Sequence, residues 1–405
     1  MAVVECASYA AAEVEAALKR ALDLIGGLDG VFGPGERVLL KPNVLSPAPP
    51  ERAVCTHPTL VAAMARLVSA AGGVPVVGES SGGSAHREGR TGRALRLSGI
   101  HAAAEGAGAA LENFDARPPA LLPRPEGRGG LYLAQAVREA GAVINLPKLK
   151  THSLTVITGA IKNLFGCVPG TLKTEYHRTH PSVAELSALL CDIYALVRPR
   201  LTVMDAVLAM EGPGPSAGHP RWLGLILAGA DGVAVDAVAS RILGLPPLSV
   251  PTTRRAAEQG LGLADPSRVE VVGLPLERAR ERARPFSLSP AAPIMPWVPG
   301  PLVRAVVGLL KVVPAVDEAR CSGCRTCALN CPAGAVRLEP RGRPAIDRRR
   351  CIECLCCQEL CPEQAVRLRS RNPLGPLLRG VGRVLEGLRP PRLEGKEFGR
   401  GGRTR

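Results

Sequence analysis

Two cysteine-rich stretches restrict the fold of this 405-residue sequence more than any other feature. Residues 321–332 read C-S-G-C-R-T-C-A-L-N-C-P, and residues 351–362 read C-I-E-C-L-C-C-Q-E-L-C-P. Each contains the pattern C-x2-C-x2-C-x3-C-P, which holds a cubane iron–sulfur cluster in bacterial proteins. Nine of the thirteen cysteines lie in this segment. We therefore expect its fold to be built around metal coordination.

The spacing predicts which cysteines share a cluster. A [4Fe–4S] cube requires four inward-pointing thiolates; three come from one tight loop, and in two-cluster proteins the fourth comes from the other motif. The predicted ligands are Cys321, Cys324, Cys327 and Cys361 for the first cluster, and Cys351, Cys354, Cys357 and Cys331 for the second. Cys356 is additional to this pattern, either as a bystander or as an alternative ligand.

The same segment is an internal repeat. C-P-A-G-A-V-R-L at 331–338 returns as C-P-E-Q-A-V-R-L at 361–368, so we expect two similar halves, each with a short apolar strand over a cluster. The segment resembles bacterial two-cluster ferredoxins, which implies a small α+β domain at 319–370 with two [4Fe–4S] clusters. Zinc is the alternative, since C-x2-C pairs also suit it. Two consecutive three-cysteine loops, each followed by Cys-Pro, favour the clusters.

Composition and charge restrict the cellular location and the binding partners that can be expected. The net charge is +15, and nineteen basic against eight acidic residues follow from position 320 onward. Only 3% of residues are aromatic, which removes the stacking surfaces of single-strand binders, so a nucleic-acid partner is not expected. The sequence contains no run of about 18 uncharged apolar residues, so no transmembrane segment is predicted. Without a secretory signal, and with cysteines used as metal ligands, a cytoplasmic location is expected.

Residues 1–284 alternate between short apolar runs and helical stretches. The expected strands are Arg37–Lys41, Val74–Gly78, Ala142–Leu146, Leu201–Asp205, Leu223–Ala228 and Arg268–Gly273. One expected helix has Thr56 as its N-cap and Pro58 in its first turn and stops at Gly72; two others cover Val183–Val197 and Val233–Leu243. This alternation predicts an α/β domain with a mainly parallel sheet covered by helices. Ligands of such sheets bind at the carboxyl ends of strands.

The remaining segments connect or follow these two domains. Residues 285–318 contain a proline-rich stretch, expected to be an extended linker, and a short apolar helix at Leu302–Val313. Residues 371–405 are rich in Arg, Gly and Pro and are expected to be a basic, disordered tail.

Polar motifs follow several of the expected strands. They are K-P-N at 41–43, G-E-S-S-G at 78–82, N-L-P-K-L-K-T-H at 145–152, G-A-I-K-N-L-F-G at 159–166, and M-D-A-V at 204–207 with E-G-P-G at 211–214. This set resembles the family of domains of unknown function numbered 362, over roughly residues 1 to 275. Members of that family are often fused to a ferredoxin domain. The resemblance implies a catalytic or binding domain but no particular reaction.

Basic side chains crowd into the loops after the third expected strand. They are Lys148, Lys150, His152, Lys162, Lys173, His177, Arg178 and His180. Because they alternate with Pro, Thr, Asn and Gly instead of recurring on one helix face, we expect a cationic pocket for a carboxylate or phosphate. A basic solvated face is the alternative. His152 and His177 are candidate general acids, and desolvated Lys148, Lys150 or Lys162 could donate protons instead.

Residues in the other motifs are candidates for binding the ligand. The predicted substrate-binding residues are Lys41, Asn43, Glu79, Lys150, Asn163, Lys173 and Asp205. Glu79, Asp205 and Glu211 follow or end strands and could hold Mg²⁺ or another hard divalent cation. An acidic residue after a strand can equally cap a helix.

Three functions fit these features. In the first, the chain is a ferredoxin-coupled oxidoreductase in which two [4Fe–4S] clusters supply electrons to an anionic small molecule in the α/β domain. A redox protein would be the electron donor or acceptor. In the second, it is an electron-transfer or assembly protein whose α/β domain binds a protein partner. In the third, it is a non-redox, metal-assisted enzyme with structural clusters.

Overall fold

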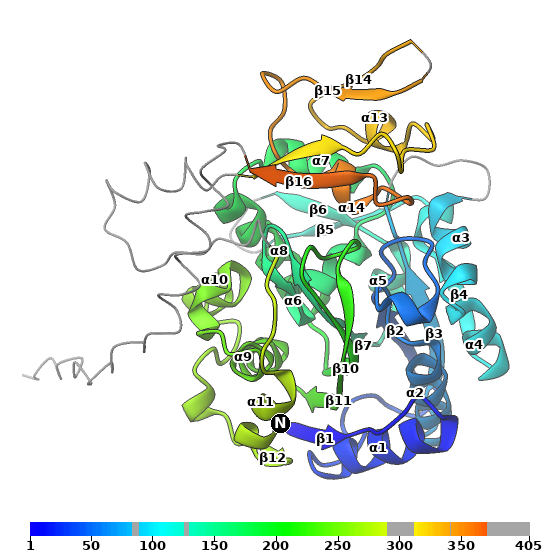
Figure 1. Ribbon diagram of the computed structural model, residues 1–405. Coiled ribbons are helices and arrows are strands. Elements are labelled where there is room, and N and C mark those ends of the chain that lie inside the picture. The colour runs from blue at the N-terminus through cyan, green and yellow to red at the C-terminus, as the bar shows by residue number, and fades with distance from the viewer. Residues whose placement is uncertain (83–88, 125–128, 290–311, 341, 371–405) are drawn as a thin grey trace, which may run out of the picture. The chain divides into compact units, whose positions relative to one another are not determined.

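The computed structural model describes residues 1–82, 89–124, 129–289, 312–340 and 342–370 (Figure 1). Met1–Pro296 and Pro314–Leu368 form one compact unit. Trp297–Val313 and Arg369–Arg405 form another, which lies almost wholly outside the described residues, as do most of the predicted linker and all of the predicted tail. Val312 and Val313, predicted to end a helix, instead open a strand, β13 (Val312–Val316).

A ten-stranded sheet forms the centre of the α/β domain. Its strands lie in the order β12 (Val272–Gly273), β1 (Ala2–Glu5), β11 (His219–Gly229), β10 (Leu201–Glu211), β7 (Ala142–Leu146), β2 (Arg37–Pro42), β3 (Val74–Glu79) and β4 (Ala110–Asn113). Beside this path, β8 (Lys148–His152) pairs with β10 and with β9 (Val156–Thr158).

The sheet is mainly parallel, as predicted. Strands β10, β7, β2, β3 and β4 run parallel, whereas β11 runs antiparallel to both β10 and β1. The predicted strands at 201–205 and 223–228 lie within β10 and β11, which form a longer antiparallel pair. The strand predicted at Arg268–Gly273 is wrong over most of its length, because Pro266–Arg268 form a 3₁₀ turn and only Val272 and Gly273 pair with β1.

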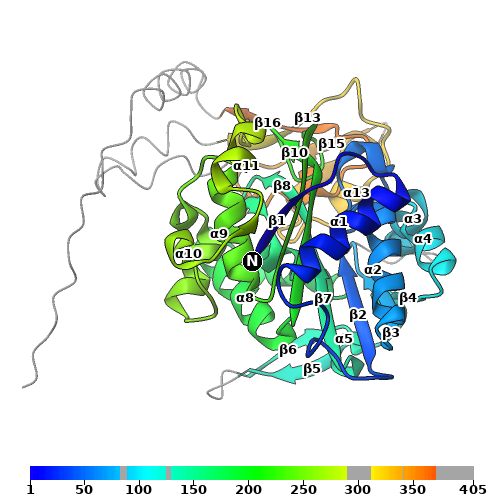
Figure 2. The same cartoon turned by 90° about the horizontal axis from the view of Figure 1, so that it is seen from below.

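Helices cover both faces of the sheet. Side chains alternate across a strand, so Val38 and Leu40 enter one core while Leu39 enters another. The first core contains residues of α1 (Ala11–Asp23) and α2 (Pro58–Ala70), and the second contains residues of α8 (Val183–Val197). Figure 2 shows these helices on opposite sides of β2 and β7. Helix α9 (Gly232–Ile242) packs against β10 and β11.

Helix starts follow local hydrogen bonding. The predicted bounds of α8 are confirmed, and a capping box of Ser182 and Glu185 begins it. The prediction of Thr56 as the N-cap of α2 is wrong: His57 is the cap, and its ring accepts from the Thr59 N–H. Thr56 Oγ1 instead accepts from the Asn43 N–H at 2.8 Å and donates to the Leu146 carbonyl at 2.7 Å, joining the ends of β2 and β7.

The remaining helices and strands of the α/β domain are short. They are α3 (Gly89–Leu97), α4 (Ile100–Gly106), α5 (Gln135–Glu139), α6 (Ala160–Asn163), α7 (Leu172–Thr179), α10 (Pro251–Glu258), α11 (Leu276–Ala283) and the antiparallel pair β5 (Ala120–Pro123) and β6 (Gly130–Leu133). No helix among the described residues is long and apolar enough to cross a membrane.

The ferredoxin segment repeats its structure as it repeats its sequence. Its first half contains α13 (Thr326–Leu329) and β14 (Val336–Leu338), and its second contains α14 (Cys356–Glu359) and β16 (Val366–Ser370). β14 pairs with β15 (Pro344–Ile346), and β16 pairs with β13. Each short helix follows a residue with left-handed backbone, Arg325 at φ 62° and Leu355 at φ 59°. This small domain with short antiparallel strands is the predicted one.

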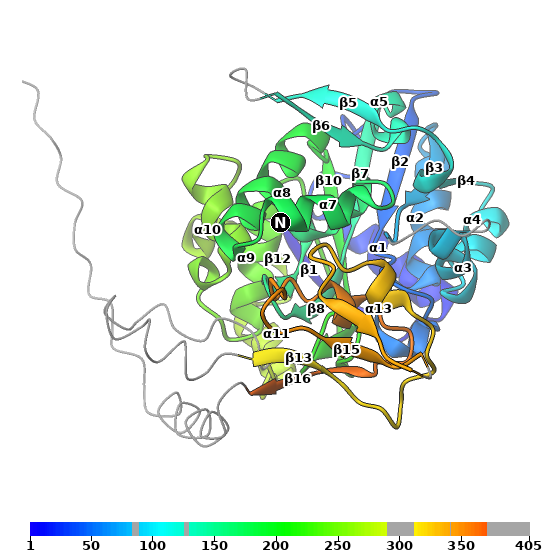
Figure 3. The same cartoon turned by 90° about the horizontal axis from the view of Figure 1, so that it is seen from above.

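Hydrogen bonds join the ferredoxin segment to loops of the α/β domain within the first unit. Figure 3 views the ribbon from the side on which this segment lies. The hydrogen bonds are Gln358 Nε2 to the Pro213 carbonyl (3.3 Å), Ser216 Oγ to the Gln358 carbonyl (3.3 Å), Gln364 Nε2 to the Ser216 carbonyl (2.9 Å) and Arg90 Nη1 to the Leu360 carbonyl (2.8 Å). The contacts centre on α14 and the residues that follow it. The α/β domain therefore meets the segment at its second cysteine loop.

Candidate functional site

Two cavities inside the ferredoxin segment are each lined by four cysteines. The first cluster cavity is lined by Cys321, Cys324, Cys327 and Cys361, and the second by Cys331, Cys351, Cys354 and Cys357. Each has an empty volume of about 320 Å³. In each set, one cysteine comes from the other repeat, which is the crossed grouping that the spacing predicts.

The surroundings of these cysteines suit a [4Fe–4S] cube. None of the eight forms a disulfide bond, and the sulfurs of Cys331, Cys351 and Cys361 accept backbone hydrogen bonds, as cluster ligands do. The Ala335 N–H donates to Cys331 Sγ at 3.1 Å, and the Ala365 N–H donates to Cys361 Sγ at 3.2 Å. Apolar side chains, including Val336 and Val366, complete the walls. The residues present therefore fit a cluster in each cavity.

Cys356 faces a different space. It is buried and does not line either cluster cavity. It lines a third cavity, here called the central pocket, of about 650 Å³ of empty volume. The geometry thus agrees with the prediction that Cys356 is a bystander to the clusters, and it places the thiol in the wall of a candidate ligand site.

The central pocket lies where the loops at the carboxyl ends of the strands meet α14. Its polar wall consists of Asn43, Glu79, Ser80, Ser81, Lys150, His152, Thr158, Lys162, Asn163, Lys173, Thr174, His177 and Glu359. Among the predicted site residues, the structure brings together Asn43, Glu79, Lys150, His152, Lys162, Asn163, Lys173 and His177.

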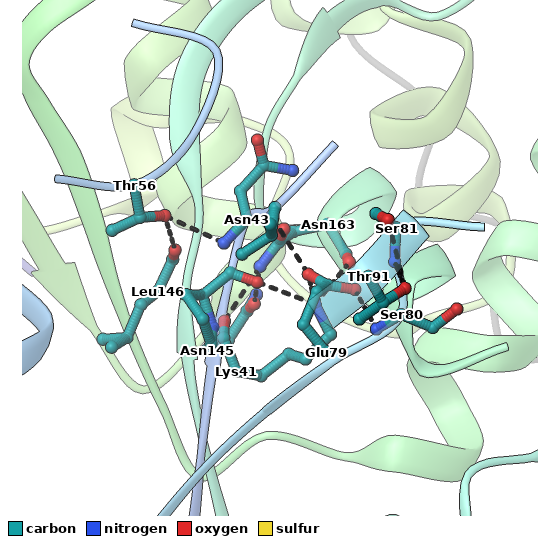
Figure 4. Close-up of polar contacts among 12 residues, drawn as sticks. Lys41, Asn43, Thr56, Glu79, Ser80, Ser81, Thr91, Asn145, Leu146 and Asn163 are labelled. Atoms are coloured by element: carbon teal, nitrogen blue, oxygen red, sulfur yellow. Dashed lines mark hydrogen bonds and ion pairs between the residues drawn. The ribbon is translucent and has the colours of Figure 1, made fainter. Parts of the chain in front are cut away.

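A buried ion pair stands behind this wall. Lys41, which does not itself line the pocket, donates to Glu79 Oε2 at 2.5 Å, and both side chains are almost completely buried. The Val44 N–H donates to the same oxygen and the Ser80 N–H to the other, so both carboxylate oxygens are occupied (Figure 4). Burial raises the pKa of Glu79, and the charge of Lys41 opposes that rise. Glu79 therefore acts as a structural anchor for the loops.

Three lysines give the pocket its positive charge. Burial lowers the pKa of Lys150 to about 7, that of Lys173 to about 8, and also that of Lys162. Lys150 donates to the Val54 carbonyl at 2.6 Å, and Lys173 donates to Ser80 and Val168. The Lys162 ammonium lies 5.0 Å from the centre of the Phe165 ring and, within the described chain, makes no hydrogen bond to protein. Lys162 is thus the ammonium most available to a ligand.

His152 is held in one tautomer. Its Nδ1 accepts from the backbone N–H groups of Leu154 (3.1 Å) and Thr155 (3.3 Å), so this nitrogen cannot carry a proton. The proton of the neutral ring is therefore on Nε2, which lies 3.3 Å from Glu359 Oε1. Burial holds the pKa of His152 well below its ordinary value. The ring is suited to donating a hydrogen bond, and its predicted role as a general acid is not favoured.

His177 is the other predicted general acid. It lines the pocket, with its ring edge-on to Phe165 at 5.5 Å between ring centres. Burial lowers the pKa of His177 to about 3, so the ring is neutral at physiological pH. This geometry also places His177 in the wall without favouring proton donation.

Glu359, on α14, was not among the predicted site residues. It is buried in the pocket wall, and burial raises its pKa while Lys162 and Lys150 oppose the rise. In sequence it lies between two predicted cluster ligands, in the run C-C-Q-E-L-C. That run gives no indication that a carboxyl group of the cysteine segment reaches the α/β domain.

Lys148 and Asp205 form a separate buried network. Lys148 Nζ donates to Asp205 Oδ2 at 2.8 Å, and the Tyr9 hydroxyl donates to Asp205 Oδ1 at 2.7 Å. Burial alone would raise the pKa of Asp205, but Lys148 and these hydrogen bonds lower it. Neither residue lines the central pocket. The structure therefore does not bring Lys148 and Asp205 to the predicted site.

Two further basic residues also lie apart from the pocket. Arg178 is exposed and pairs with Glu175, and His180 bonds to the residues preceding it. The predicted divalent cation gains no support either: Glu79 binds Lys41, Asp205 binds Lys148, and Glu211 accepts from the Ser287 N–H. These acids have separate partners.

Five buried polar atoms in the pocket wall make no aligned hydrogen bond to the described residues, although two of them, His152 Nε2 and Glu359 Oε1, lie 3.3 Å apart. They are Asn43 Oδ1, His152 Nε2, Thr158 Oγ1, Asn163 Oδ1 and Glu359 Oε1. Buried polar atoms are normally paired, and leaving one unpaired costs about 1–3 kcal/mol. Their concentration in one cavity indicates a site built to be filled by a polar ligand or by water.

Comparison with known proteins supports this division of the chain. The family described as domain of unknown function (DUF362) matches residues 38–241, and a 4Fe-4S dicluster domain matches residues 320–365. The thylakoid-associated protein sll1697 of Synechocystis sp. is 37% identical over 287 residues, which are 68% of this chain and 82% of that protein.

Two solved structures align with part of the chain. The lactate racemase apoprotein of Thermoanaerobacterium thermosaccharolyticum aligns with a TM-score of 0.39 at 14% identity, over 60% of this chain and 57% of its own. A Thermotoga maritima protein aligns with a TM-score of 0.32 at 12% identity, over 67% of this chain and 62% of its own. The chain thus spans less than two thirds of either structure, and neither informs its chemistry.

Proposed function

Since the chain belongs to the domain of unknown function 362 family and carries an iron–sulfur domain, we propose that it is an oxidoreductase. Its substrate is a small anionic molecule bound in the central pocket. Two [4Fe–4S] clusters, held by the eight cysteines of the two cluster cavities, supply the single-electron chemistry.

The observation that carries this proposal is the shared position of α14. Cys354 and Cys357 line the second cluster cavity, while Cys356 and Glu359 line the central pocket. Next to this helix, Leu360 lines the pocket and Cys361 lines the first cluster cavity. Both cluster cavities therefore come within one residue, along the chain, of the pocket wall. A binding domain unrelated to redox chemistry would not require this arrangement.

The donors in the pocket select an anion. Lys162 and Lys150 offer ammonium groups, and His152 offers its Nε2–H from a ring that two backbone groups orient. Charge-assisted hydrogen bonds of this kind are about twice as strong as neutral ones. A carboxylate or phosphate group would satisfy all three donors.

An acceptor in the same wall restricts the ligand further. Asn163 Nδ2 donates to the Asn145 side-chain oxygen (2.7 Å) and to the Lys41 carbonyl (3.1 Å). Because Asn145 in turn donates to the Ala160 carbonyl, both amides have a fixed direction (Figure 4). The unpaired Asn163 Oδ1 can only accept. The proposed ligand therefore carries a hydroxyl or amino donor besides its anionic group.

Lys150 is the proposed proton donor. Its pKa of about 7 lets it hold and release a proton near neutral pH, as general acid catalysis requires. Lys173, with a pKa of about 8, already donates to three acceptors and is assigned to holding the Ser80 loop. The side chains of Lys150 and Glu359 in the wall are themselves buried, which strengthens their electrostatic interactions.

We also propose domain bounds, a redox partner and a cellular location for the protein. The α/β domain is assigned to residues 1–284 and the ferredoxin domain to 319–370. A redox protein is proposed as the electron donor or acceptor, and the use of cysteines as metal ligands supports a cytoplasmic setting.

The experiment is an anaerobic reoxidation assay on the holoprotein. The reduced protein is mixed with a low-mass metabolite fraction while its visible absorbance is followed. Recovery of the oxidised spectrum is expected, with loss of the response in Lys162→Met. Arg178→Gln is the matched control because Arg178 is an exposed cation on α7 that does not line the pocket.

Other outcomes would reassign the function. Reoxidation by a protein fraction alone would indicate an electron carrier whose α/β domain binds a partner. Reoxidation by neither fraction would contradict the proposal and leave a non-redox enzyme with structural clusters.

A further inference from the structure

Arg90 is a cation of the α/β domain placed beside the first cluster cavity. It lies in the first turn of α3, and its Nη1 donates to the Leu360 carbonyl at 2.8 Å. That carbonyl belongs to the residue before Cys361, a predicted ligand of the first cluster. Arg90 therefore reaches from the α/β domain to the backbone of a cysteine loop.

Two donors of this guanidinium are unused. Nε and Nη2 of Arg90 are buried and have no hydrogen-bond partner in the described parts of the chain. Burial lowers the pKa of Arg90 to about 10, and the charges of Cys361 and Cys324 oppose this effect. The group is thus still a cation at neutral pH, and two cysteines of the first cavity are near enough to act on its charge.

The second cluster cavity has a different electrostatic setting. The residue that matches Arg325 in the repeat is Leu355, and no charged residue lines the second cavity. In the first cavity, Arg325 is accompanied by Glu363, so their opposite charges offset each other. Arg90 therefore adds a positive charge near the first cavity, whereas Cys354 of the second cavity is exposed to the negative charge of Glu359.

We propose that Arg90 is a positioning residue whose charge, held at the backbone of the loop that precedes Cys361, makes the first cluster easier to reduce than the second. Reduction adds one electron and hence one negative charge to a cluster. A nearby cation stabilises that charge and raises the reduction potential. The two halves of the repeat are then unequal in potential, and the inequality comes from the other domain.

The test is a redox titration of the holoprotein followed by electron paramagnetic resonance. Cys324→Ser, which changes a ligand of the first cavity, identifies the signal of the first cluster. In Arg90→Gln, that signal is expected to shift to a more negative potential while the other stays in place. Arg93→Gln is the matched control because Arg93 is exposed on the same helix.

The charge-preserving variant separates tuning from folding. Arg90→Lys keeps the cation but loses the planar fork of donors, so a smaller negative shift is expected with full iron and sulfide content. No shift in either Arg90 variant, or an equal shift of both signals, would overturn the proposal. Should Arg90→Gln lose iron, the Arg90→Lys titration decides the matter. None of these measurements needs a substrate, so their failure is distinct from failure of the proposed function.

Discussion

Lys150 makes the stability of this protein depend on pH. Burial lowers its pKa from 10.5 to about 7 in the folded state, whereas the unfolded chain should retain the ordinary value. Between these values the unfolded state binds one more proton, so the free energy of unfolding rises with pH by about 1.4 kcal/mol per pH unit. Over the whole window this amounts to about 5 kcal/mol, fully lost at and below pH 7.

Replacing Lys150 with Met removes this titration. The variant should be more stable than the wild type near pH 7, because it buries no desolvated amine, although it gives up the hydrogen bond to Val54. Its advantage should shrink by about 1.4 kcal/mol per unit as pH rises from about 7.5 to 9.5. Titrations of the other buried lysines are common to both proteins and cancel in the difference.

The assay is anaerobic urea unfolding of both proteins at a series of pH values, followed by circular dichroism. Lys19→Met serves as control because the Lys19 side chain is 57% exposed, and it should leave the pH dependence unchanged. Equal pH slopes for Lys150→Met and the wild type would refute the reasoning. That result would mean that Lys150 keeps an ordinary pKa, and it would remove the basis for its role as proton donor.

Four other substitutions test the cysteine grouping and the packing of the α/β domain. Cys324→Ser should reduce the iron and sulfide content whereas Cys356→Ser should not, as measured by metal analysis; equal iron losses would contradict the grouping of the cavities. Lys148→Met should destabilise the fold by about 3–5 kcal/mol, since it leaves a buried carboxylate unpaired, and an unchanged urea midpoint would contradict this. Gly166→Ala should cost about 1–3 kcal/mol, because its Cβ would meet Glu79 Oε1 at 2.0 Å; wild-type stability would show that the loop can move aside.

Local patterns predicted the parts of this structure that depend on neighbouring residues. The spacing of Cys321, Cys324 and Cys327 reflects one loop that surrounds one cube. The apolar run at Ala142–Leu146 predicts a buried strand whichever strands lie beside it. The bounds of α8 could be predicted for the same reason, because the capping box that begins the helix involves only the neighbouring residues Ser182 and Glu185. Such features require no knowledge of distant parts of the chain.

The central pocket could not be predicted from local patterns, because its residues come from distant parts of the chain. Lys148 and Lys150 are alike in sequence, yet Lys148 pairs with Asp205 while Lys150 faces the pocket, because the choice depends on β10. Glu359 and Cys356 were missed as pocket residues because they belong to the cysteine segment and contribute to the site only through docking of α14. The direction of β11 likewise depended on its pairing with β10.

The four-residue helix α14 contributes residues to both the second cluster cavity and the central pocket. Its backbone is held between cysteines that line the two cluster cavities, and its own side chains close the central pocket. A chain that has not received its clusters would lack the restraint that fixes this wall, so maturation of the ferredoxin domain would also complete the binding site. Under the proposed function, affinity for the substrate would then be confined to those copies whose clusters are in place.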